Sequence, residues 1–450
     1  MKKLILPFIW LFLVQVGYPQ GFQEICQSKI TNGTVVDCDY FKDTLYATGF
    51  FDLACGQAVG YIAKWENMEW RPSTISISDP GHSLRVIDNK LYIAKYVESI
   101  DSNWVYVYED SIPRKLGRGV YLTTASGFSE LANIYDIIEF EGEIIACGEF
   151  DRVGEDSIKG IMRWDGANWK GLGTGLDGNI SGTASVMFPH QMMVYEGELY
   201  VAGNFKQAGG VNVNGIAKWN GTQWSNLGAG FNGTVYSMTI YKNEIIVGGS
   251  FTESGGVPLN RIAKWDGTDW AALDFGFTAT SPNDFIFVHT LTLIDGVLYI
   301  GGGLREIAYS DGRTVPCNGI VSFANDSIYT FNGGVAGNDI EAICKTPDGR
   351  LLVGGGVFGR GYTGLSDLIT GTRNHPASPR VKIGPNPFVD YISVEIEVTP
   401  QSFELLNGMG QLIKRGKFER RFQLDLPEGT YFLKLIHRDG TFTMHKLIRN

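Results

Sequence analysis

Short apolar stretches alternate with turns rich in Gly, Asn and Asp along most of the chain, and one phrase returns several times. The copy at residues 235–270 contains four strand signals in order, at 236–241, 244–251, 260–265 and from Trp270 onward. Alternating apolar and polar positions between such turns are typical of β-strands. Four antiparallel strands in a repeat of this length predict one blade of a β-propeller.

The first hairpin of the repeat can be followed through seven copies. The copies start near Val35, His82, Ile134, Pro189, Val235, Val288 and Glu341. The seventh lacks the hairpin with two Trp residues, whereas Asn32-Gly33-Thr34-Val35 repeats a phrase that elsewhere follows a fourth strand, Asn232-Gly233-Thr234-Val235. We therefore expect residues 22–30 to complete the seventh blade, which would leave no free sheet edge at the closure of the ring.

The predicted fold is all-β: a seven-bladed propeller over residues 21–360, a Gly/Ser/Thr/Pro-rich linker at 361–380 with a poor third strand at 365–370, and a smaller domain at 381–450. Residues 1–20 predict a secretory signal peptide, with Lys2 and Lys3 before a short apolar core. A membrane anchor is the alternative, but the apolar core is shorter than the ~20 residues that span a bilayer. No later segment predicts a transmembrane helix in the mature chain.

The net charge of −10 and the absence of a Lys/Arg cluster argue against binding to nucleic acid. None of the six cysteines forms a CxxC pair, which argues against a structural zinc site, and an exported chain permits disulfides. Cys38 and Cys344 fall at one register in the first strands of the first and seventh blades. A Cys38–Cys344 bond is therefore predicted at the closure, with two small buried side chains as the alternative.

The repeat resembles kelch-type propellers in its Gly248-Gly249 doublet, its aromatic third strand and the Trp that opens the fourth strand. The phrase Asn214–Trp224 is also similar to repeats of the Rax2-like cell-surface proteins. The resemblance implies a propeller and leaves the chemistry open, because propellers serve many functions.

The C-terminal residues resemble the type A sorting domain of type IX secretion in Bacteroidetes. The matching motif residues are Pro385, Asn386, Pro387, Gly410, Gly429, Tyr431 and Lys446. The resemblance implies a small Ig-like β-sandwich at 381–450 that engages the type IX secretion machinery, followed by removal of the tail and release or attachment at the cell surface. An ordinary carbohydrate-binding sandwich is the alternative.

One register of the predicted innermost strands carries an unusual set of side chains. Its members, nine positions before the Leu or Ile that begins each second strand, are Val36, His82, Tyr135, His190, Tyr236, His289 and Ala342. A ring of His and Tyr at a central channel could bind a metal or an anionic ligand. The simpler interpretation is packing, because Leu84, Ile137, Met192, Met238 and Leu291 alternate on the same face.

Two functions follow from the sequence. The first is a binding or scaffold protein for an extracellular protein or glycan, which uses Gly-rich loops such as 207–210 and 254–256. The second is a metal-dependent oxidase or a hydrolase that uses the His/Tyr register; Asp37, Asp136, Gln191 and Ser237 could also face its channel. We assign no catalytic residue, metal ligand or cofactor, and we expect Trp65, Trp164, Trp219 and Trp265 to pack within or between blades.

Overall fold

A computed structural model describes the fold. It covers residues 23–24, 34–356 and 366–368 and, in the tail, 382–449, with short gaps within the two long ranges. The gaps are 56, 68, 98–101, 110–111, 124–128, 131, 179, 181–186, 282–283, 332–338, 348, 350, 385–390, 396–399, 408–411, 425 and 437–441. The chain divides into two compact units, Met1–Arg373 (unit 1) and Asn374–Asn450 (unit 2). The predicted signal peptide at 1–20 lies outside the described residues.

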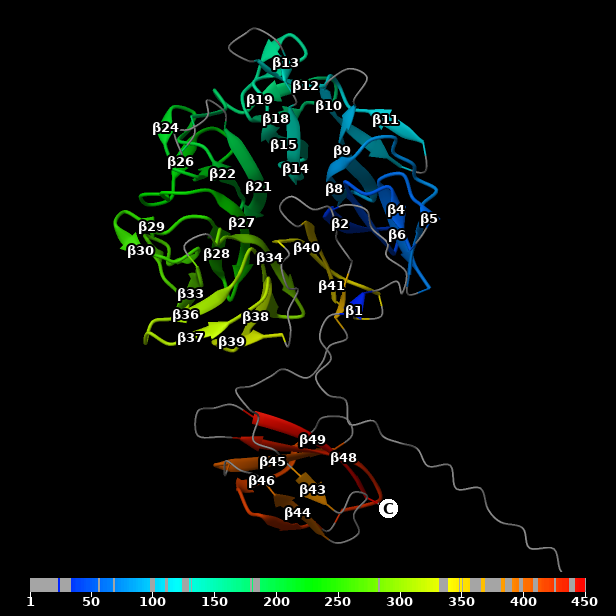
Figure 1. The fold of residues 1–450 in the computed structure, drawn as a ribbon, viewed down its shortest axis with the longest axis vertical. Helices are drawn as coiled ribbons and strands as arrows, with labels where there is room; N and C mark the ends of the chain where they lie inside the picture. Colours follow the sequence, from blue (N-terminus) through cyan, green and yellow to red (C-terminus); the bar gives the residue numbers. More distant parts are fainter. Residues whose placement is uncertain are drawn as a thin grey trace, which may run out of the picture. The chain divides into compact units, whose positions relative to one another are not determined.

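Unit 1 consists of antiparallel sheets that repeat one strand order (Figure 1). The first strands are β2 (Val35–Phe41), β8 (Gly81–Ile87), β14 (Asn133–Phe140), β21 (Phe188–Tyr195), β27 (Val235–Tyr241), β34 (Val288–Ile294) and β40 (Asp339–Lys345). Each pairs with a second strand: β3 (Thr44–Gly49), β9 (Lys90–Val97), β15 (Glu143–Glu149), β22 (Glu198–Asn204), β28 (Glu244–Gly249), β35 (Val297–Gly302) or β41 (Leu351–Gly356).

The sheets then continue outward. The third strands are β6 (Ile62–Glu66), β10 (Ser102–Tyr108), β18 (Ile161–Trp164), β25 (Ile216–Trp219), β31 (Ile262–Trp265), β38 (Ile320–Ala324) and β42 (Ser366–Leu368). The fourth strands are β7 (Glu69–Pro72), β11 (Pro113–Lys115), β19 (Trp169–Gly171), β26 (Trp224–Asn226), β32 (Trp270–Ala271), β39 (Ser327–Thr330) and β1 (Gln23–Glu24). This hairpin pattern matches the four strand signals of each repeat.

The sheet that contains β40 draws on both ends of unit 1, in the order β40-β41-β42-β1. Gln23 pairs with Asp367, and Glu24 pairs with Ser366. The N-terminal segment thus supplies the outermost strand of the last sheet, as its sequence predicts. The third strand of this sheet, β42, lies within the expected linker at 361–380, where the sequence predicts a poor strand at 365–370.

The first strands face the middle of unit 1 and lie against one another in chain order, and β40 in turn contacts β2 (Figure 1). The apolar residues that alternate with the His/Tyr register are buried between them, with exposures of at most 5% for Leu84, Ile137, Met192, Met238 and Leu291. The packing interpretation is confirmed for these five. The arrangement of the sheets resembles the blades of a propeller.

The two ends of the sheets differ in their connections. In six of the seven sheets, first and second strands join through two-residue turns such as Lys242-Asn243, where both residues have positive φ, as type I′ hairpins require. At the opposite end, the link from second to third strand carries a further hairpin in several sheets. These hairpins are β4–β5 (Leu53–Ala54, Gln57–Ala58), β16–β17 (Arg152–Val153, Asp156–Ser157), β23–β24 (Gln207–Ala208, Val211–Asn212), β29–β30 (Glu253–Ser254, Val257–Pro258) and β36–β37 (Glu306–Tyr309, Thr314–Pro316).

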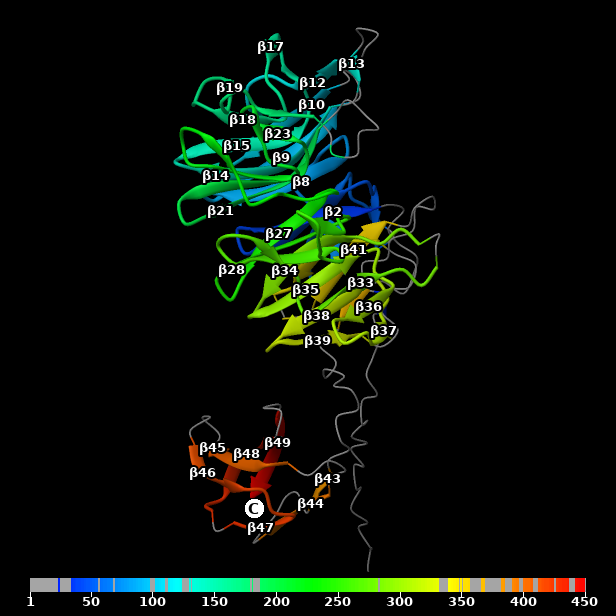
Figure 2. The ribbon, with the colours of Figure 1, turned by 90° about the vertical axis from the view of Figure 1, so that its left-hand side faces the viewer.

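We call this second end the loop face and the other the turn face. Figure 2 shows unit 1 from the side, with the turn ends of β14, β21 and β28 towards the left and β36 and β37 towards the right. Three hairpins of the loop face pair with the segment that leaves the preceding sheet. These segments are β12 (Val120–Thr123) with β16, β20 (Leu176–Asp177) with β23, and β33 (Phe275–Thr278) with β36.

Unit 2 contains two antiparallel sheets around one core. The sheets have the orders β43-β44-β47 and β46-β45-β48-β49. Their strands are β43 (Lys382–Gly384), β44 (Tyr391–Glu395), β45 (Ser402–Asn407), β46 (Leu412–Lys417), β47 (Arg421–Gln423), β48 (Gly429–Ile436) and β49 (Phe442–Arg449). Buried Ile392 and Phe422 of one sheet pack with Phe403, Leu433 and Leu447 of the other, which makes unit 2 a β-sandwich.

Candidate functional site: an aromatic arc on the loop face

Every first hairpin of unit 1 contains a register shift near the start of its first strand. The residue left out of the ladder is Val36, His82, Tyr135, His190, Tyr236, His289 or Glu341. A β-bulge of this kind redirects a side chain away from the ladder, and bulges are common beside functional sites. The His/Tyr register of the sequence is therefore a set of bulge residues at the loop face.

The seventh member of this set is Glu341, and the expectation of Ala342 is wrong. Ala342 pairs with Gly354 inside the ladder. Counting back from the second strand misplaced the register because the seventh hairpin has a longer turn. Five residues separate the paired Lys345 and Leu351, whereas four separate the equivalent pair, Ile240 and Ile245.

The aromatic bulge residues form a continuous row across five neighbouring sheets. The ring centroids are 6.2 Å apart for His82 and Tyr135, 5.3 Å for Tyr135 and His190, 4.9 Å for His190 and Tyr236, and 5.3 Å for Tyr236 and His289. These distances are typical of interacting aromatic pairs. The five predicted ligand-binding residues thus lie together in the structure.

Phenylalanine side chains extend the row at the His82 end and flank it at the other. The Phe50 ring lies 4.9 Å from His82. The Phe287 ring lies 5.7 Å from Tyr236, 6.1 Å from His289 and 5.4 Å from Phe285. Phe50 is 46% exposed and Phe285 is 64% exposed. We call the whole row, from Phe50 through the five bulge residues to Phe287 and Phe285, the aromatic arc. These three Phe residues lie outside the repeated register, because Phe285 and Phe287 precede a first strand and Phe50 follows a second strand.

The arc is uncharged at neutral pH. Burial lowers the pKa of His82 to about 4 and that of His190, aided by the nearby His289, to about 3. Burial likewise lowers the pKa of His289 to about 4, although a hydrogen bond with the backbone of Glu341 opposes the shift. Burial raises the pKa of Tyr135, whose hydroxyl donates to Glu149 Oε2 at 3.1 Å, so Tyr135 stays protonated.

Below the arc, side chains next to the bulge residues join adjacent sheets. In each case a side-chain oxygen accepts a hydrogen bond from a backbone N–H of the following first strand. Asp37 accepts from Leu84 at 2.9 Å, and Asp136 accepts from Met192 at 2.7 Å. Gln191 accepts from Met238 at 2.5 Å, and Ser237 accepts from Leu291 at 3.1 Å. Such bonds satisfy buried polar groups and position the strands. These four residues therefore hold sheets together.

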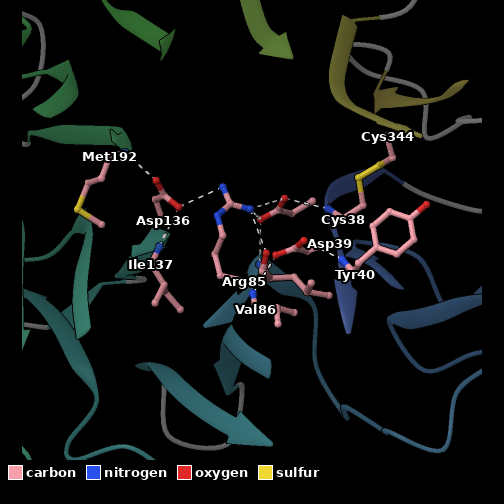
Figure 3. A network of polar contacts seen from close by, with 11 residues as sticks. Cys38, Asp39, Tyr40, Arg85, Val86, Asp136, Ile137, Met192 and Cys344 are labelled. Carbon is pink, nitrogen blue, oxygen red and sulfur yellow. Dashed lines mark hydrogen bonds and ion pairs between the residues drawn. A yellow bond between two sulfur atoms is a disulfide. The ribbon is translucent and has the colours of Figure 1, made fainter. Parts of the chain in front are cut away.

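Arg85 joins two carboxylates that the sequence places two blades apart. Its guanidinium lies 2.8 Å from Asp37 Oδ2 and 3.1 Å from Asp136 Oδ1, so it bridges β2 and β14 from β8 between them (Figure 3). Burial raises the pKa of the Asp136 carboxyl, and the charge of Arg85 opposes that shift. Burial alone would lower the pKa of Arg85, but Asp37 and Asp136 raise it. No repeat signal marks Arg85, because it occurs in one copy.

The repeated Trp residues form a second set of links near the outer strands. The indole N–H of Trp169, Trp224 and Trp270 donates to the carbonyl of Leu116, Leu172 and Leu227, respectively, in the segment leaving the preceding sheet. Each of these leucines precedes a glycine with positive φ, Gly117, Gly173 or Gly228, that lies against the Trp pair. The expected packing role of the Trp residues is confirmed for Trp164, Trp219 and Trp265, which contact these glycines.

The junction between the last and first sheets carries a covalent link. Cys38 on β2 and Cys344 on β40 form a disulfide with a Cα–Cα distance of 6.5 Å, which confirms the predicted pairing. Cys55 is also disulfide-bonded, and Cys147 and Cys317 are free and buried.

The described residues contain no group of three or more His, Cys, Asp or Glu side chains that could hold a metal ion. In the tail, the hydroxyl of the buried Tyr431 donates to the Pro427 carbonyl at 2.7 Å, Gly429 begins β48, and Lys446 on β49 pairs with Phe432. The other predicted motif residues, Pro385, Asn386, Pro387 and Gly410, lie outside the described residues.

Comparisons with solved structures give only distant similarity. An acylaminoacyl peptidase of Pyrococcus horikoshii has a TM-score of 0.39 and 11% identity, over 82% of this chain and 59% of that one. A puromycin-hydrolyzing peptidase of Mycobacterium tuberculosis has a TM-score of 0.35 and 12% identity, over 82% and 61%. BamB from Moraxella catarrhalis has a TM-score of 0.19 and 13% identity, over 91% and 93%. The chain thus spans about three fifths of the length of the two peptidases.

No curated protein matches the chain. In the part of the chain that the structure describes, no helix has the length and apolar character needed to span a membrane. Residues 382–450 match the family described as "Secretion system C-terminal sorting domain". The tail of this chain is therefore a sorting domain of type IX secretion, and the protein is exported to the cell surface or released from it.

Proposed function

We propose that this protein is a seven-bladed, kelch-like β-propeller that acts outside the cell as a binding protein, with the aromatic arc as its binding site. In this proposal a signal peptide at 1–20 starts export, the propeller occupies 21–360, a linker follows at 361–380, and an Ig-like sorting domain at 381–450 engages the type IX machinery. The organism would then be a member of the Bacteroidetes.

Closure of the ring is supported by packing at the junction of the last and first sheets. A Cβ built on Gly354 of β41 would lie 2.8 Å from Val35 Cβ on β2. Gly301 stands in the same relation to Ile340, and Gly248 to Val288, at the two preceding junctions. The last junction therefore repeats the close contact of the others, and the Cys38–Cys344 disulfide adds a covalent bond to it.

The binding role rests on one observation, that the aromatic arc and the longer connections of unit 1 lie on the same face. Six of the seven turns on the turn face have only two residues, so this face offers less loop surface. Binding residues are commonly carried by loops on a rigid scaffold, and exposed aromatic side chains are enriched at binding sites. The loops at 207–210 and 254–256 would form part of the rim around the arc.

The proposal is tested by comparing variants of the two faces in the full chain. Phe285→Ser removes an exposed ring from the arc, and Leu293→Ser removes a 44% exposed leucine near the turn face. Whole glycan arrays and extracellular protein extracts are then probed with each variant. Ligands that bind the wild type and Leu293→Ser, but not Phe285→Ser, are expected; a ligand lost only with Leu293→Ser would contradict the proposal.

A further inference from the structure

The chemistry of the aromatic arc indicates a class of ligand. We infer that the arc binds a neutral oligosaccharide, whose sugar rings stack on the exposed rings of Phe50 and Phe285 and whose hydroxyls bond to the His and Tyr side chains between them. This inference rests on the proposed function, because it names the ligand class of the same site.

The first argument is the lack of charge on the arc. With pKa values of about 4, 3 and 4, His82, His190 and His289 are neutral imidazoles outside the cell. A neutral imidazole offers one N–H donor and one acceptor nitrogen, and a Tyr hydroxyl offers both functions. Sugar hydroxyls also donate and accept, so they match this set better than a charged group does.

The second argument is an unused hydrogen-bonding atom. His289 Nδ1 is buried and has no hydrogen-bond partner in the structure. A buried polar atom without a partner costs about 1–3 kcal/mol, and most buried polar groups are paired. Trp70 Nε1 and Asn103 Nδ2 are also unpaired, but His289 Nδ1 belongs to the row of rings. A ligand hydroxyl above the arc would supply the partner.

The third argument is the length and exposure of the arc. Phe50 and Phe285, at its two ends, are the most exposed of its rings, and neither is needed to fill a core. Aromatic faces stack well on the apolar C–H surfaces of a flat ligand. A row of rings that crosses five sheets, with an exposed Phe ring at one end and another beside the other end, suits a chain of several sugar units better than a single one.

Anionic ligands fit the arc less well. An anion would need a cation in contact with the rings; Arg85, below the arc, bridges Asp37 and Asp136. Arg261 donates to the backbone carbonyls of Ser250 and Phe251. Protonated histidines could attract an anion only below pH 5, given their pKa values. The net charge of −10 also repels polyanions.

The test measures binding of the full chain by calorimetry. The probes are neutral hexasaccharides of the cello, xylo, malto, manno and chito series, with hexagalacturonate as the anionic comparison. Phe285→Ser removes a stacking surface, His190→Phe keeps a ring and removes its nitrogens, and Leu293→Ser is the control on the other face. At least tenfold weaker binding of one neutral series is expected for the first two variants, with no change for the control and little change between pH 8 and 5.5.

Three results would overturn the inference. The first is that none of the neutral series binds. The second is that only hexagalacturonate binds, with affinity that rises as the pH falls. The third is that a neutral series binds both arc variants as tightly as the wild type. If a protein ligand is lost with Phe285→Ser while no sugar binds, the carbohydrate assignment fails and the proposed binding face stands. If ligand binding depends on Leu293 alone, both fail.

Discussion

Arg85 shows how a single residue can fix the centre of unit 1. It neutralises two carboxylates from different sheets, and each carboxylate also accepts a backbone N–H from the sheet that follows it. Asp136 is the fully buried member of this cluster, so removing Arg85 leaves its buried charge unpaired, which costs up to about 3–5 kcal/mol. We therefore expect Arg85→Met to lower the free energy of unfolding by about that amount in urea titrations followed by Trp fluorescence.

A triple variant serves as the control for this prediction. In Asp37→Asn/Arg85→Met/Asp136→Asn the charges are gone, but the amide oxygens can still accept the N–H groups of Leu84 and Met192. We expect it to be more stable than Arg85→Met alone. A single variant as stable as the wild type, or a triple variant no better than the single one, would show that charge compensation is not what Arg85 provides.

The histidines of the arc predict a pH dependence of stability. Their pKa values in the folded protein are about 4, 3 and 4, below the ordinary value of 6.5, so the unfolded chain takes up protons first as the pH falls. Stability present above pH 6.5 should therefore be lost towards pH 4, by about 1.4 kcal/mol per pH unit for each histidine.

The measurement is a series of urea titrations between pH 7.5 and 4.5. His190→Gln should reduce the slope of stability against pH, whereas His445→Gln, in unit 2, should leave it unchanged. Trp fluorescence reports only unit 1, because no Trp follows Trp270. A slope that is the same in the wild type and in His190→Gln would contradict the neutral arc.

At the scale of elements, the links between sheets depend on glycines that make room for Trp rings. Gly117 has a φ of +68°, and a Cβ there would lie 2.6 Å from Trp164 Cζ3. Gly267 has a φ of +102° and open space around it. At either position Ala must adopt a positive φ, which lowers the free energy of unfolding by about 1 kcal/mol. Only Gly117→Ala also displaces the Trp pair.

We therefore expect Gly117→Ala to be destabilised more than Gly267→Ala, by a further ~1–3 kcal/mol in urea titrations. The comparison isolates packing between sheets from backbone strain within a turn. Equal losses of stability in the two variants would mean that the contact between Gly117 and the Trp pair contributes nothing.

The strands themselves can be predicted from the sequence, because the alternation of apolar and polar residues and the turn residues between strands depend only on neighbouring positions in the chain. The hairpins, the packing face with Leu84 and Met192, and the N-terminal strand β1 all follow from the repeat. The links between sheets are harder to predict. The Leu172-Gly173 and Leu227-Gly228 pairs recur three residues after a Trp, a signal that could have been found, but their partner is the next sheet and no local pattern names it.

The site is predictable in part for the same reason. His190 and Tyr236 stand out at one register, whereas Arg85 and Phe285 occur once and gain their meaning only from neighbours distant in the chain. Glu341 was missed because a longer turn shifts the count in the last hairpin.

At the scale of the whole molecule, the short strand β1 should protect the edge of the last sheet. Gln23→Pro/Glu24→Pro removes both backbone N–H groups of β1, including the one that faces β42 in the antiparallel pair. We expect faster amide exchange in residues 366–368 by mass spectrometry, with unchanged exchange in the sheet of β27 and β28. Unchanged exchange at 366–368 would show that the N-terminal segment does not shield this strand.

The most direct test of the account is a non-reducing peptide map of the exported protein, because the proposed ring brings together cysteines 306 residues apart. The account predicts a peptide in which Cys38 is bonded to Cys344, and no alkylation of either thiol before reduction. Free, alkylated Cys38 and Cys344 in the folded protein, or their bonding to other cysteines, would contradict the proposed closure of the ring, on whose loop face the aromatic arc lies.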